Sequence, residues 1–129
     1  MRAGLVLAFA VLAAFAAEAA AQDEHRRRLA AELTIMAGDL RRLEAATEPP
    51  LRLDGLRTRL AGALASLPLL MRRAGADAGA VPGLRDALAR RDWRSMRASL
   101  RTLQDTHPFD ARALLPAEAT PAQLRVGEA

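Results

Sequence analysis

Residues 29–43, LAAELTIMAGDLRRL, decide the fold class because their apolar residues recur at helical spacing. The large apolar residues follow one another in steps of 4, 3, 4 and 3: Leu29, Leu33, Met36, Leu40 and Leu43. This spacing places one narrow apolar stripe along one face of a helix, which we expect over residues 23–46. A single amphipathic helix cannot bury its own stripe. The stretch therefore predicts packing against other helices.

The second predicted helix covers residues 53–73. Its apolar positions again lie on one face: Leu53, Leu56, Leu60, Leu64, Leu67 and Met71. Pro49 and Pro50 separate it from the first helix. Pro68 lies inside the segment and lacks the N–H that an unbroken helix needs, so we expect a kink or a restart near Leu67.

Two shorter helices are predicted beyond a loop at residues 74–83, in which Pro82 suits a first helical turn. The segment 84–107 reads as two helices that meet at Arg91 and Asp92, with Asp92 as the cap of the second. One continuous helix is the alternative. The expected apolar positions are Leu84 and Leu88 in one helix, and Trp93, Met96, Leu100 and Leu103 in the other. Pro108 ends the last helix at His107.

Four amphipathic segments with short connections predict an all-α fold, an antiparallel four-helix bundle over residues 22–107. β-branched residues are few and form no alternating run, so no strand is expected. The remaining residues are divided into a linker at 108–119 and the start of a further helix at 120–129. We expect Phe109, Leu114 and Leu115 of the linker to pack back on the bundle.

The N-terminal stretch MRAGLVLAFAVLAAFAAEAAAQD has the layout of a secretory signal peptide. Arg2 is followed by an apolar run over residues 3–17 and by the small residues Ala19 and Ala21, so cleavage is expected after Ala21. A membrane anchor is the alternative, and it needs roughly 18 to 20 apolar residues. The sequence therefore predicts a periplasmic or secreted protein with residues 1–21 removed and no membrane span afterwards.

Composition argues against several classes of partner and site. The chain has no Cys, which excludes a disulfide, a lipidated cysteine and a covalent haem site within these residues. All 19 basic residues are Arg, but 15 acidic residues are interspersed and the net charge is only +4. There is no basic block with interleaved aromatic residues, so a nucleic-acid partner is not expected.

No pattern of catalytic residues stands out, and an enzyme is not expected. The carboxylates of Asp39, Glu44 and Glu48 are interpreted as parts of a solvated helix face. His25 and His107 are the two histidines, and in an antiparallel bundle they are expected at the same end. Two imidazoles there would suit haem iron or a metal, although an ordinary helix-terminal histidine is the simpler interpretation.

The segment 86–107, DALARRDWRSMRASLRTLQDTH, resembles the region between the third and fourth helices of exported four-helix-bundle cytochromes that hold a b-type haem. The resemblance implies Met36 and His107 as haem ligands. The rise per residue of a helix argues against this pair of ligands, because Met36 lies about 20 Å into the first helix and is not expected to be level with His107.

The tail at residues 119–129, ATPAQLRVGEA, resembles the opening helix of bacterial class I cytochrome c domains. Thr120 and Pro121 match its cap, Leu124 and Val126 its apolar face, and Gly127 its small residue. The preceding residues 107–116, HPFDARALLP, resemble the linker between an exported helical module and such a cytochrome. The chain ends before the Cys-x-x-Cys-His that attaches haem, so haem c is expected only in a missing downstream domain.

Three functional hypotheses follow. The resemblance implies a non-catalytic periplasmic module that docks or orients a cytochrome c-like haem domain or another periplasmic redox protein. The second hypothesis is an independent exported structural or interaction bundle. The third is a bundle that binds haem b or a metal through His107 with His25 or Met36.

Overall fold

The computed structural model describes residues 2–110, with side chains from residue 9 onward. It contains four helices: α1 (Arg2–Ala45), α2 (Pro50–Arg73), α3 (Val81–Ala89) and α4 (Trp93–Thr106). The predicted partial helix at 120–129 and most of the predicted linker, including Leu114 and Leu115, lie outside the described residues.

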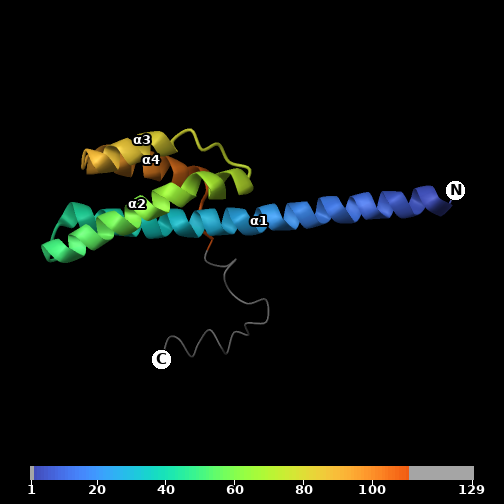
Figure 1. Cartoon of the computed structure of the whole chain (residues 1–129), viewed down its shortest axis with the longest axis horizontal. Helices are drawn as coiled ribbons and strands as arrows, with labels where there is room; N and C mark the ends of the chain where they lie inside the picture. The colour runs from blue at the N-terminus through green and yellow to red at the C-terminus, as the bar shows by residue number, and fades with distance from the viewer. Residues whose placement is uncertain (1, 111–129) are drawn as a thin grey trace, which may run out of the picture.

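The four helices form an all-α, antiparallel bundle, as the sequence predicted. α1 packs against α2 and α4, and α3 packs against α4 and α2, so the helices close a ring. Successive helices run in opposite directions (Figure 1). This arrangement lets each apolar stripe face the other three.

The core confirms the apolar positions expected from periodicity. All five residues of the predicted α1 stripe are buried, from Leu29 to Leu43. The other helices contribute Leu56, Leu60, Leu64, Leu67, Met71, Val81, Leu84, Ala87, Met96, Leu100 and Leu103. Leu53, Leu88 and Trp93 are only partly buried and pack at the edge of this core.

α1 is longer than the predicted first helix because it begins at Arg2 and continues without interruption through the predicted cleavage site. Ala and Leu are among the strongest helix formers, and they dominate this segment. Its first half projects beyond the bundle (Figure 1), and Phe9, Leu12 and Phe15 are each more than 60% exposed. Within the described part of the chain, no helix has both the length and the hydropathy of a membrane span.

The sequence predicted a kink or a restart near Leu67; α2 passes through Pro68 as one helix, so the restart does not occur. The helix ends at Arg73, and Gly75 just beyond it has a φ of 75°, the left-handed conformation that glycine adopts readily. The amide of Ala76 then donates to the carbonyl of Met71 over 2.8 Å, which closes the end of the helix.

α3 and α4 are separate helices, which excludes the single continuous helix. Arg91 adopts a φ of 56°, and the amide of Asp92 donates to the carbonyl of Ala87 over 2.9 Å. Asp92 caps α4 as predicted, since its carboxylate accepts from the amide of Ser95 over 3.2 Å. α4 ends at Thr106 with His107 as its C-cap, so the predicted helix end is confirmed. Phe109 was expected to pack on the bundle, but it is 42% exposed.

Candidate functional site

His25 lies on α1 at the edge of a groove between α1 and α2. The groove has a volume of about 450 Å³ and is lined by His25, Arg28, Ala31, Glu32, Ser66, Leu69, Leu70 and Arg73. The imidazole is half-buried, and its Nδ1 is enclosed without a hydrogen-bond partner among the described residues. The groove is therefore lined by one imidazole, two guanidinium groups and one carboxylate, while the enclosed Nδ1 does not reach its surface.

His107 lies at the C-terminal end of α4. Its amide donates to the carbonyl of Leu103 over 2.9 Å, so the residue completes the last turn of the helix. Its side chain is half-buried. This placement fits the simpler interpretation of a helix-terminal histidine.

Met36 lies in the middle of the bundle core and is 1% exposed. Its neighbours on the α1 stripe, Leu33 and Leu40, are equally buried. The thioether therefore fills apolar space between helices, which is the ordinary role of a core methionine.

The structure does not bring the two histidines to one level. Arg97 of α4 pairs with Glu44 of α1 over 2.9 Å, and the two helices are antiparallel. Ten residues further along α4, His107 is therefore level with about residue 34 of α1. His25 lies about nine residues, or about 13 Å, beyond that level. Met36 is closer in height to His107 than the sequence predicted, but its side chain is in the core.

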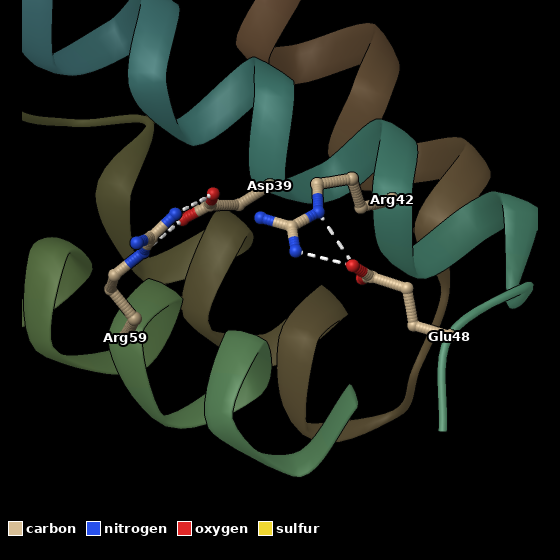
Figure 2. A network of polar contacts seen from close by, with 4 residues as sticks. All are labelled: Asp39, Arg42, Glu48 and Arg59. Atoms are coloured by element: carbon tan, nitrogen blue, oxygen red, sulfur yellow. Dashed lines mark hydrogen bonds and ion pairs between the residues drawn. The ribbon is translucent and has the colours of Figure 1, made fainter. Parts of the chain in front are cut away.

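Asp39 is the polar residue whose role the sequence interpretation missed. It was assigned to a solvated face, but it is only 4% exposed. Its carboxylate accepts two hydrogen bonds from Arg59 of α2, one of them from Nε over 2.8 Å (Figure 2). The correction has a physical reason: the carboxylate lies where α1 meets α2, and the guanidinium satisfies both of its oxygens. The hydrogen bonds raise the pKa of Arg59.

Arg42, near the end of α1, makes a second two-point contact with Glu48, which lies in the connection between α1 and α2 (Figure 2). Arg42 Nε donates to Glu48 Oε2 over 3.1 Å. This hydrogen bonding lowers the pKa of Glu48 and raises that of Arg42. Glu48 is thus engaged in shaping the turn and does not belong to an open solvated face.

A further carboxylate that the sequence assigned to solvent joins two helices. Glu44 accepts from Arg97 of α4, and its side chain is only 22% exposed. All three of these acidic residues are therefore tied to arginines. For Asp39 and Glu44, the signal that was available in the sequence is their position one turn from residues of the apolar stripe, at the helix–helix boundary.

An apolar groove of about 460 Å³ opens between α2 and α3. Leu64 forms its floor together with Ala61, Leu88 and Ala89. Arg57 and Arg85 line it from α2 and α3 respectively, and Arg85 is exposed. This groove combines apolar surface with positive charge at its margin.

Metal ligands do not cluster in the described part of the chain. Among its side chains, no group of three His, Cys, Asp or Glu residues is placed to hold a metal ion.

Comparisons with protein families, with curated proteins and with solved structures give no match for this chain.

Proposed function

We propose that this protein is an exported, non-catalytic helical module that docks a cytochrome c-like haem domain. The proposal combines the resemblance of residues 119–129 to the opening helix of such a domain with the surface of the bundle. The observation that carries it is the α2–α3 groove, which offers apolar contact area flanked by Arg57 and Arg85.

The chemistry of the groove suits a protein surface with an apolar centre and acidic margins. Ala61, Leu88 and Ala89 provide apolar contact, and a guanidinium forms two parallel hydrogen bonds with a carboxylate. The exposed edge of a c-type haem is apolar, and its propionates are acidic. Among the described residues, Arg85 has no ion-pair partner and can pair with such a group, whereas Arg57 already pairs with Asp54.

The engaged carboxylates support a docking role more than a catalytic one. Asp39, Glu44 and Asp92 each hold a helix or a helix end in place. Groups committed to such contacts are not available to transfer protons, since general acid–base catalysis needs a carboxyl within reach of a substrate.

Titration of the ¹⁵N-labelled secreted protein with a bacterial class I cytochrome c tests the docking. Resonances of Ala61, Leu88 and Ala89 should shift on addition of the cytochrome, and Arg85→Glu should weaken binding about tenfold or more. Arg101→Glu, on α4, is the matched charge control and should bind like the parent protein. Resonance shifts confined to other surfaces, or equal weakening of cytochrome binding by both variants, would reject the groove as the docking site.

The gene offers an independent test of the cytochrome connection. We expect the DNA after the codon for Ala129 to encode a Cys-x-x-Cys-His segment in one of its three forward frames. If that segment is missing and the cytochrome does not bind, the alternative of an independent structural or interaction bundle is favoured.

A further inference from the structure

The burial of α1 in the bundle begins at Gln22. Every side chain from residue 9 to Ala21 is exposed, and Gln22 is the first of the described side chains that is partly buried. The cleavage site expected after Ala21 therefore lies where the projecting part of α1 meets the folded bundle. The small residues that mark such a site, Ala19 and Ala21, are both on the exposed side of this boundary.

Gln22 lies against the chain just beyond the end of α2. A Cβ on Gly75 would overlap the side-chain amide of Gln22. One turn further along α1, Arg26 Nε donates a hydrogen bond to the carbonyl of Ala74 over 3.3 Å. These contacts involve no residue before Gln22, so a chain that begins there keeps its first turn on the end of α2.

Cleavage after Ala21 makes the α-amino group of Gln22 the start of the chain. An N-terminal glutamine can react with itself, because its own Cδ is placed to close a lactam ring with that nitrogen. The neutral amine attacks Cδ and a C–N bond forms, while the bond from Cδ to Nε2 breaks. Nε2 takes up the proton that the amine gives up and leaves as ammonia. The reaction needs no oxidant, reductant or other reactant.

The charges around Gln22 favour the neutral amine, which is the form that attacks. The positive end of the α1 dipole disfavours an ammonium group at the start of the helix. Asp23 and Glu24 would offset this effect, but both pair with arginines of the next turn, Asp23 with Arg26 over 3.5 Å. Arg73 lines the same pocket as Gln22 and adds positive charge.

We propose that Gln22 is a modification site: after removal of residues 1–21 it closes to pyroglutamate, a neutral lactam that caps the shortened α1. The inference rests on the export that is part of the proposed function and on cleavage after Ala21. Loss of the terminal charge removes an unfavourable interaction with the positive end of the helix. The modification should therefore stabilise the first turn of α1 on the end of α2.

Intact-mass spectrometry of the exported protein tests the modification. The expected mass is that of the chain that begins at Gln22, less one molecule of ammonia. Edman sequencing should be blocked, because the lactam has no primary amine. Gln22→Met is the matched control, since methionine is similar in length but has no carboxamide. That variant should keep the full mass of its processed chain and should be sequenced normally.

An unmodified Gln22 at the N-terminus, also after prolonged incubation at neutral pH, would overturn the proposal and leave export intact. A chain that begins at any other residue would overturn the proposal together with the predicted cleavage. Neither readout involves a cytochrome, so a failure of the docking titration is a separate result.

Thermal denaturation tests the effect on α1. Release of the same chain from an N-terminal fusion, by a protease that cuts immediately before Gln22, gives the unreacted form at the start of an incubation. The melting temperature should then rise as the fraction of lactam rises. Gln22→Met, prepared and incubated in the same way, should show no rise. An unchanged or falling melting temperature in the parent protein would reject the lactam as a cap of α1.

Discussion

The carboxylate of Asp39, buried on α1, accepts two hydrogen bonds from the guanidinium of Arg59 on α2 (Figure 2). The two residues are 20 positions apart in the chain, and their contact fixes the register of the first helical hairpin. A buried carboxylate needs such a partner, because its charge is otherwise poorly solvated.

Arg59→Gln should lower the stability of the bundle, because it leaves the Asp39 carboxylate buried without its guanidinium. Adding Asp39→Leu to that variant should recover part of the loss, since the unpaired charge is then absent. Urea denaturation of the single and double variants measures both effects. Arg42→Gln is the control and should cost less, because the side chain of Glu48 is 20% exposed and that of Asp39 only 6%. Strictly additive losses in the double variant would contradict the coupling.

Met36→Ala should reduce the free energy of unfolding by about 2–5 kcal/mol, because it empties space in the core. Ile35→Ala, at the adjacent position that is 52% exposed, should change it by about 0.5 kcal/mol or less. Thermal or urea denaturation compares the two variants. If instead the parent protein bound haem, and Met36→Ala kept its stability but no longer bound haem, the haem-b hypothesis would gain support.

Arg91→Gly should stabilise the protein by about 1 kcal/mol, because the left-handed conformation at Arg91 costs an L residue about that much. Arg90→Gly is the matched control. Arg90 has a φ of −84°, so glycine there relieves no strain and should give no gain. Melting temperatures of the two variants decide the question, and a lower melting temperature for Arg91→Gly would be the contrary result.

Acid should destabilise the bundle through Asp92 and Glu48. Hydrogen bonds from Ser95 lower the pKa of Asp92, and those from Arg42 lower the pKa of Glu48. The unfolded chain therefore binds protons more readily than the folded one. The contribution of these two carboxylates to the free energy of unfolding is present above about pH 4 and is lost as the pH falls through their folded-state pKa values. Asp92→Asn keeps a capping oxygen that does not titrate, so its unfolding free energy should fall less steeply below pH 4. An unchanged slope would argue against the Asp92 contribution.

The form of the protein that begins at Gln22 should fold with the same core as the full chain, because among the side chains that the structure describes the buried ones begin at Leu29. Intact-mass measurement of the exported protein should give that form, and its circular dichroism should remain helical. A shorter form that begins at Leu33 is the comparison. It should be clearly less stable, since it lacks the core residues Leu29 and Ala30. Export without cleavage would contradict the signal-peptide prediction.

The sequence by itself determined the fold class and most of the core. The apolar spacing on α1, α2 and α4 follows from 3.6 residues per turn, and every residue of the α1 stripe is buried as predicted. The cap at Asp92 and the helix end at His107 were also predicted correctly, because both depend on neighbours in the chain. Local chemistry of this kind is readable without knowledge of the rest of the molecule.

Only the tertiary structure decided which polar residues are buried and which candidate ligands share a level. Asp39 looks like a surface residue in the sequence, since its partner Arg59 belongs to another helix. The heights of His25 and His107 depend on the register of α4 against α1, which the contact of Arg97 with Glu44 reports across 53 positions of chain. Helical periodicity specifies the face of a residue, but contacts between helices determine what lies opposite it.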